Sequence, residues 1–308
     1  QAPVFNLGTG TLSYSYSTSS VGVTTSFEIP PSRTVTSITL NNVNGITLAG
    51  GNLSMSLGTP VLTMTLGSLD LGGNTLTVGS GPTVLGTITN TTGFILNGTL
   101  TRWFGTTASP ITIANSNGGH FPMGTGTVSS PVNRNLWLSF SVATALSTGG
   151  TISVTHNAAS GITAITPFDD GGYNVENRTN LNWSVSQSGL ALTGTINARM
   201  QASSPGFAVG TVANLRMIRA TDAVGTFSAG TNTAADPQVN RTALDLTMLA
   251  NSFYLGANNS DMSVLISWVG ASGLWSDAAN WSSNPSIPTS TDNVILTPGS
   301  ASNITVDG

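Results

Sequence analysis

The chain has 308 residues, of which 39% are hydrophobic and only 6% are charged, against about 25% charged residues in an ordinary globular protein. Enough apolar residues for a core, together with a formal net charge of only −4, argue against intrinsic disorder. The mild acidity and the lack of lysine argue against a nucleic-acid partner, and the absence of cysteine excludes disulfides, thiolate metal sites and cysteine nucleophiles.

Residues 1–35 predict a group of polar N-terminal strands. Alternating sequence favours strands over Gly10–Ser17 and Thr24–Ile29, and Pro30 and Pro31 end the second of these. These strands are candidates for a segment that joins one chain to another.

Residues 36–131 predict a β-solenoid-like domain. Apolar residues fall in pairs two positions apart, and each pair is flanked by Gly or Asn, which is the rhythm of short strands separated by sharp corners. The pairs are Ile38 and Leu40, Ile46 and Leu48, Leu53 and Met55, Leu62 and Met64, Leu69 and Leu71, and Leu76 and Val78. Asn42, Asn44, Asn52 and Asn74 fit the corners, because Asn tolerates left-handed backbone. An antiparallel meander with tight turns is the alternative.

Residues 132–266 predict an antiparallel β-sandwich, because longer alternating runs are separated by polar turns. The expected strands are Leu136–Val142, Gly150–His156, Asn182–Gln187, Ala191–Met200, Leu215–Arg219 and Ser252–Leu255. The best helix candidate in the chain is Thr242–Phe253, although its LDLTML stretch also alternates as a strand would.

Residues 267–308 predict the start of a further β unit. The segment ends where a new series of short strands would begin. We therefore expect either that the sequence is one part of a longer chain or that its last strands pair with another subunit. Gln1 fits a chain whose signal peptide has been removed, and it fits a shortened chain equally well.

Three stretches carry a resemblance to a known group of proteins. They are GTLTRWF (98–104) followed by HFPMGTG (120–126), the long run NRTNLNWSVSQSGLALTGTINARM (177–200), and WVGASGLWSDAANWSSNPSIPTSTDNVIL (268–296). They resemble the repetitive β-rich surface and adhesin-like proteins of Bacteroidetes-type bacteria, many of which use type IX secretion. The third is similar to the W-x-G…N-W opening of autotransporter-like repeats.

The resemblance implies adhesion, surface layers or appendages at the cell surface or outside the cell, and no defined reaction. A polar surface made of Thr, Ser and Asn fits that location. No run of about 18 apolar residues occurs, so we expect no transmembrane segment.

Few residues are candidates for metal or cofactor binding. His120 and His156 are too few for a zinc site, which needs three or four ligands; we expect His120 in a turn and His156 at the rim of a strand. Asp169 and Asp170 precede two glycines and are weak calcium candidates, with a charged turn as the competing interpretation. We expect no other cofactor.

Trp275 and Trp281 are candidates for stacking on sugar rings, although burial in a core or at the cap of a solenoid is the stronger interpretation of the tryptophans. Polysaccharide cleavage would need paired carboxylates, and residues 36–103 contain only Asp70, predicted to point outward, and a late arginine, Arg102.

The leading hypothesis is therefore a non-enzymatic extracellular structural or adhesive protein that self-associates or binds other surface proteins. Its copies would join by strand pairing into a filament, sheath or appendage. The alternatives are a carbohydrate-binding module of a larger secreted protein and a polysaccharide-active β-helix enzyme.

Overall fold

The computed structural model describes residues 13–17, 21–26, 28–106, 119–140, 146–270, 273–283, 285–289, 292–296 and 303–307. Across these residues the fold is almost entirely β. The helical elements are the single turn α1 (Leu246–Leu249) and two short 3₁₀ segments, Val212–Asn214 and Ala278–Asn280. The all-β class predicted from the sequence is confirmed.

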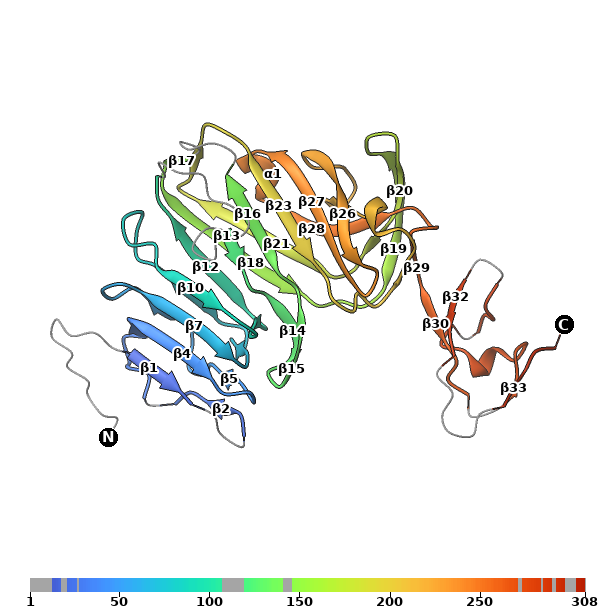
Figure 1. The fold of residues 1–308 in the computed structure, drawn as a ribbon, viewed down its shortest axis with the longest axis horizontal. Helices are drawn as coiled ribbons and strands as arrows, with labels where there is room; N and C mark the ends of the chain where they lie inside the picture. Colours follow the sequence, from blue (N-terminus) through green and yellow to red (C-terminus); the bar gives the residue numbers. More distant parts are fainter. Residues whose placement is uncertain are drawn as a thin grey trace.

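The N-terminal part is a β-solenoid of four coils, each of which adds one strand to three parallel sheets (Figure 1). Successive strands of each sheet are roughly one coil apart in sequence, as in the pairing of Ser37 with Val61 and of Leu76 with Leu100. The first sheet contains β1 (Ser13–Tyr16), β4 (Ser37–Asn41), β7 (Val61–Leu66) and β10 (Thr87–Asn90), the second β2 (Val23–Thr24), β5 (Ile46–Thr47), β8 (Leu69–Asp70) and β11 (Ile95–Leu96), and the third β3 (Thr34–Val35), β6 (Leu53–Met55), β9 (Thr75–Val78) and β12 (Thr99–Phe104).

Parallel pairing stacks the paired apolar residues in columns inside the solenoid. One column runs from Tyr14 through Ile38 and Leu62 to Ile88, and all but Tyr14 are buried. Burying one such aliphatic side chain is worth about 1.5–3 kcal/mol, so the columns hold the coils together. The solenoid prediction is confirmed and the meander is not.

The corners of the solenoid use glycine and asparagine in different ways. Gly67 has φ +80°, and a Cβ there would lie 1.8 Å from the Asn42 carbonyl oxygen, so only glycine fits. Asn42 is fully buried between β4 and β5, where its Nδ2 donates to the Val21 carbonyl and its Oδ1 accepts from the Asn44 amide. Asn42 therefore stabilises its corner through side-chain hydrogen bonds, whereas glycine supplies the left-handed backbone.

The first coil begins earlier than the predicted boundary at residue 36. β1 pairs in parallel with β4, β2 with β5 and β3 with β6, so the strands within residues 13–35 belong to the solenoid. The sequence predicted strands in this segment but did not assign them to the solenoid, because Tyr14 and Tyr16 stand where the next coils carry aliphatic residues. Residues 1–12 lie outside the described residues.

The solenoid continues directly into the antiparallel region. β12 pairs in parallel with β9 on one side and antiparallel with β18 on the other, which makes one ten-stranded sheet. Arg102 of β12 pairs with Val78 of β9, so the last coil carries a buried arginine where the coil before it carries valine. Nη1 of Arg102 donates to the His120 carbonyl over 2.5 Å. The antiparallel members of this sheet are β18 (Gly150–Asn157), β19 (Ile162–Asp169), β20 (Asn174–Thr179), β21 (Asn182–Ser188), β25 (Arg216–Ile218) and β28 (Ser252–Ala257).

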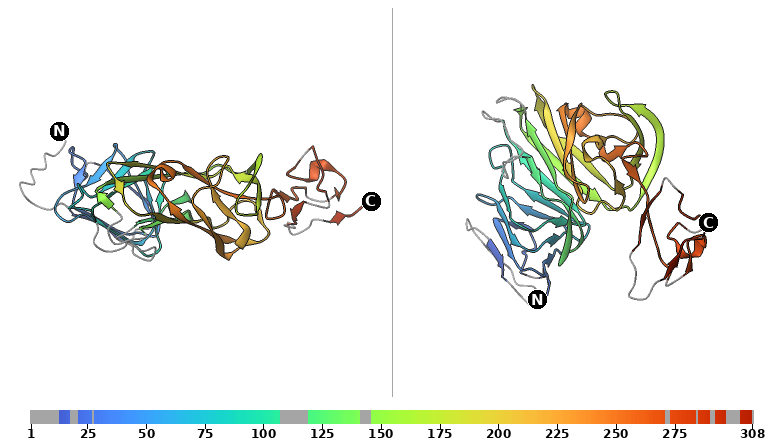
Figure 2. Two further views of the ribbon diagram at one scale, coloured as in Figure 1. Left: turned by 90° about the horizontal axis from the view of Figure 1, so that it is seen from above. Right: turned by 45° about the vertical axis from the view of Figure 1, so that its right-hand side comes forward.

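A second, five-stranded antiparallel sheet accompanies the first (Figures 1 and 2). Buried residues of both sheets and of the solenoid form a single hydrophobic cluster, so the solenoid and the predicted sandwich region share one core. This sheet contains β13 (Gly119–Phe121), β16 (Leu136–Phe140), β23 (Ile196–Gln201), β27 (Asp236–Leu244) and β26 (Thr226–Thr233). Short pairs are β14 (Gly124–Thr127) with β15 (Ser130–Asn133), β17 (Leu146–Thr148) with β22 (Ala191–Leu192), and β24 (Ala208–Val209) with β29 (Met262–Ser263).

The helix considered over Thr242–Phe253 does not form. β27 extends to Leu244, α1 makes a single turn with Asp245 as its N-cap, and β28 begins at Ser252. Leu244, Leu249 and Phe253 are all buried, so tertiary packing outweighs the local helical pattern.

The C-terminal unit is a small separate structure built from β30 (Leu265–Ser267), β31 (Gly273–Leu274), β32 (Asn293–Ile295) and β33 (Ile304–Thr305). β30 pairs in parallel with β32, and β31 with β33, so each strand meets its counterpart one coil later. Its own core comprises Ile266, Trp268 and Trp281. Figure 1 shows it apart from the main body, at the opposite end of the long axis from β1.

Within the described residues, no helix has the length and apolar character that crossing a bilayer requires.

Candidate functional sites

Among the open sheet edges of the described residues, two parallel ones lie at the ends of the chain. β1, β2 and β3 each pair on one side only, and these three strands form the N-terminal edge. β32 and β33 likewise have one partner each and form the C-terminal edge. An open parallel edge presents unpaired backbone N–H and C=O groups that a further strand can satisfy.

The C-terminal edge also exposes apolar side chains. Leu274, Ile295, Leu296 and Val306 are all exposed, the last at 77%. At the N-terminal edge, the half-buried Tyr14 and Tyr16 hydrogen-bond to Glu28 through the Glu28 carbonyl and carboxylate respectively. Burial, together with the charge of Glu28, raises the pKa of Tyr16 well above its usual value, so both rings stay neutral and available for packing.

Trp281 is buried, so it cannot make the glycan contact considered from the sequence. Trp281 is 1% exposed and makes edge-to-face contacts with Trp268 and Trp275 at centroid distances of 5.0 and 4.5 Å. Its Nε1 donates to the Trp275 carbonyl over 2.7 Å. Trp281 therefore forms the core of the C-terminal unit, and only the half-buried Trp275 keeps part of its ring accessible.

The calcium candidates have other partners. Asp170 is buried in the turn after β19, where its carboxylate accepts bonds from Nη1 and Nη2 of Arg241, and Nε of Arg216 lies 3.5 Å away. Asp169 accepts the Gly172 amide over 3.1 Å, which is the charged-turn alternative. Two cations already neutralise Asp170, so a calcium ion would have to displace them.

Both histidines lie in strands and are buried, so the turn predicted for His120 is wrong, whereas His156 does stand near the end of its strand. His120 is in β13 and stacks on Trp137 at 5.1 Å, and His156 is near the end of β18 against the edge of Trp183. Burial lowers the pKa of His120 to about 4 and that of His156 to about 3. Both imidazoles are therefore neutral at physiological pH.

Asp70 makes hydrogen bonds on the surface of the solenoid. Its Oδ1 accepts from the backbone amide of Gly72 and its Oδ2 accepts from Nδ2 of Asn97, both over 2.8 Å. Across the described residues, no three His, Asp or Glu side chains gather closely enough to bind a metal ion.

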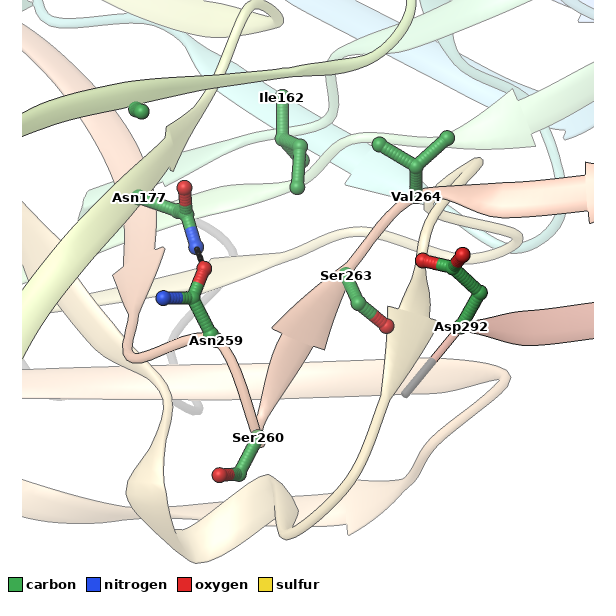
Figure 3. A pocket seen from close by; sticks show the side chains of 8 residues that line it. Ile162, Asn177, Asn259, Ser260, Ser263, Val264 and Asp292 are labelled. Atoms are coloured by element: carbon green, nitrogen blue, oxygen red, sulfur yellow. Dashed lines mark hydrogen bonds between the residues drawn. The ribbon is translucent and has the colours of Figure 1, made fainter. Parts of the chain in front are cut away.

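A cleft of about 740 Å³ lies where the C-terminal unit leaves the main body (Figure 3). Asn177 from β20 and Asn259 lie together on one side of it, where Nδ2 of Asn177 donates to Oδ1 of Asn259 over 2.7 Å. Ile162, Val264 and Asp292 contribute two apolar side chains and one carboxylate. Sequence reasoning missed this site because its residues come from four separate segments and no local motif links them.

The chain matches no known family model, and it has no significant match among curated proteins or among solved structures.

Proposed function

We propose that this protein is a non-enzymatic extracellular structural or adhesive surface protein whose copies join by strand pairing. The observation that carries the proposal is the pair of open parallel edges at opposite ends of an elongated β framework (Figures 1 and 2). A contact between two different edges of successive copies is head-to-tail, and it produces a filament when the rotation between copies does not close a ring.

The chemistry of the two edges supports this contact. The exposed apolar residues beside β32 and β33 lose water when a strand covers them, and Tyr14 and Tyr16 offer partly buried rings as a complementary surface. The low charge of the chain removes the repulsion that would otherwise oppose stacking of many identical copies.

The test is electron microscopy and sedimentation velocity of the purified chain and of three variants. Leu296→Asp and Val306→Asp place a charge on the C-terminal edge, at side chains that are already exposed and so tolerate substitution. Deletion of residues 1–15 removes most of β1. We expect filaments from the unchanged protein and shorter or no polymers from these variants.

The matched control is Leu66→Asp. Leu66 is 39% exposed at the end of β7, two strands from β1 in its sheet, so its variant should polymerise normally. A monomeric unchanged protein, or equal polymers from all variants, would refute joining at these edges.

A carbohydrate-binding function is the second candidate, and we place it at the cleft of Figure 3 rather than on Trp281. Amide, hydroxyl and carboxylate groups beside apolar side chains are what sugar hydroxyls and ring faces require. A glycan array with the unchanged chain and with Asn259→Ala tests it. Binding that the variant loses supports this function, and an empty array removes it.

A further inference from the structure

Asn97 and Gly98 form the corner between β11 and β12, in the last coil of the solenoid. An asparagine that precedes glycine loses its side-chain ammonia readily, because glycine has no Cβ to shield its backbone nitrogen from the asparagine Cγ. The sequence contains this pair at Asn44–Gly45, at Asn97–Gly98 and at Asn117–Gly118, the last of which lies outside the described residues.

The two described Asn–Gly corners differ in their hydrogen bonds. Gly45 is buried, and its backbone N–H donates to the Asn42 carbonyl over 2.8 Å. The backbone N–H of Asn44 donates to Oδ1 of the same asparagine over 3.1 Å. Asn97, by contrast, is exposed, and the backbone N–H of Gly98 makes no hydrogen bond to any described residue. Of the two corners, only the second therefore combines an unbonded attacking nitrogen with a side chain open to water.

We propose that Asn97 is a site of spontaneous deamidation in the folded protein. The backbone nitrogen of Gly98 loses its proton to solvent and bonds to Cγ of Asn97, while the Cγ–Nδ2 bond breaks and Nδ2 leaves as ammonia. Water then opens the cyclic imide. Cleavage between the nitrogen and Cγ gives aspartate, and cleavage between the nitrogen and the main-chain carbonyl carbon gives isoaspartate. Asn97 has φ +47°, a left-handed conformation that aspartate tolerates as asparagine does, so the backbone does not oppose the first product.

Both products change the contacts of this corner. Nδ2 of Asn97 donates to Oδ2 of Asp70 over 2.8 Å, and aspartate replaces this donor with a second carboxylate. Isoaspartate instead adds one carbon atom to the main chain of a corner that has only two residues. That corner joins β11, which pairs with β8, to β12, which pairs with β9 and with β18. Deamidation therefore loosens the last coil where the solenoid meets the antiparallel sheets.

The test is a chymotryptic peptide map by tandem mass spectrometry of the full chain, aged at mildly alkaline pH both folded and in concentrated urea. In urea both corners lose their structure, so Asn44 and Asn97 should lose ammonia at similar rates. In the folded chain Asn97 should react about tenfold faster than Asn44 or more, because attack at Asn44 requires both hydrogen bonds of its corner to break. The map separates Asn117 from both. Equal protection of the two corners by folding, or faster loss at Asn44, would overturn the proposal.

Asn97→Asp reproduces one product without ageing and tests the effect of the new charge. Its melting temperature should lie below that of the unchanged protein at low salt. The difference should shrink in roughly 1 M salt, where the Debye length is only about 3 Å.

The matched control is Asp70→Asn/Asn97→Asp, which exchanges donor and acceptor across the same hydrogen bond. The amide at position 70 can then donate to the carboxylate at position 97, so the melting temperature should recover. A melting temperature unchanged by Asn97→Asp, or equally low in the double variant, would overturn the proposed loosening of the coil. Joining at the sheet edges is a separate question, because β1, β2 and β3 belong to the first coil and Asn97 to the last.

Discussion

Asp170→Asn tests whether the buried charge cluster between the two antiparallel sheets is structural. The side chains of Asp170, Arg216 and Arg241 are exposed by no more than 7%. At the 3.5 Å separation of Arg216 and Asp170, an effective dielectric constant of about 20 gives an attraction of about 5 kcal/mol. The neutral amide leaves two guanidinium groups buried without a counter-charge, so we expect the free energy of unfolding to fall by about 3–5 kcal/mol.

Urea denaturation followed by tryptophan fluorescence measures this loss, because Trp183 lies in the shared core. The matched control is Asp222→Asn, which breaks the solvent-exposed pair of Asp222 with Arg219 and should cost about 1 kcal/mol or less. A loss at Asp170 no larger than at Asp222 would refute the buried-cluster argument. A midpoint raised by calcium in the unchanged protein, and not in Asp170→Asn, would restore the metal hypothesis.

Two further predictions follow from the corners and from the histidines. Gly67→Ala should lower the free energy of unfolding by at least about 2 kcal/mol, because its Cβ meets the Asn42 carbonyl. Gly73→Ala has open space around the new Cβ, so it should cost only about 1 kcal/mol of backbone strain. Chemical denaturation of both variants checks this difference. Below pH 6.5 the unfolded chain takes up protons that folded His120 and His156 accept only near pH 4 and pH 3. The free energy of unfolding should therefore fall between pH 6.5 and 4 by about 1.4 kcal/mol per pH unit for each histidine, and the slope should flatten in His120→Gln/His156→Gln.

The solenoid could be predicted because its coils depend on local sequence. A pair such as Leu62 and Met64 is buried on one face of a short strand, and glycine in the adjoining corner turns the chain into the next sheet. These features recur along the sequence, so their period is visible without a structure. Parallel pairing then follows because each strand and its counterpart in the next coil are close together in the sequence.

The continuous sheet could not be predicted, because it depends on one non-local pairing. β12 and β18 meet in register between Thr99 and Thr155, which are 56 residues apart. Apolar and polar residues alternate along both strands, and this alternation would be the same if the strands belonged to separate domains. The sequence therefore predicted a domain boundary at residue 131 instead of a shared sheet. The pattern of burial identifies which face of a strand is inward, but not which strand lies beside it.

The candidate sites show the same limit. Asp170 and Arg241 are 71 residues apart, so the sequence predicted the acidic turn but could not predict the ion pair that Asp170 makes there. The cleft of Figure 3 likewise draws its lining from β19, from β20, from residues 259–264 and from Asp292. Residue type could suggest that the tryptophans are buried, as it did for Trp281, because large aromatic rings are rarely left in water.

The shared core predicts that the solenoid and the two antiparallel sheets unfold as one cooperative unit. The solenoid and both antiparallel sheets contribute to one hydrophobic cluster, while Ile266, Trp268 and Trp281 form another. Elements that share a core and an unbroken sheet lose their packing together, so we expect one calorimetric transition for residues 13–263 and a separate, smaller one for the C-terminal unit.

Trp281→Ala assigns the two transitions. Removal of this buried ring should cost about 3–5 kcal/mol and shift only the smaller transition, whereas Leu62→Ala, a core substitution within the solenoid, should shift only the larger. Differential scanning calorimetry of the two variants measures both shifts. Separate transitions for the solenoid and the antiparallel sheets would show that the junction at β12 and β18 is weaker than its hydrogen bonds imply. A single transition for the entire chain would mean instead that the C-terminal unit depends on the main body for its stability.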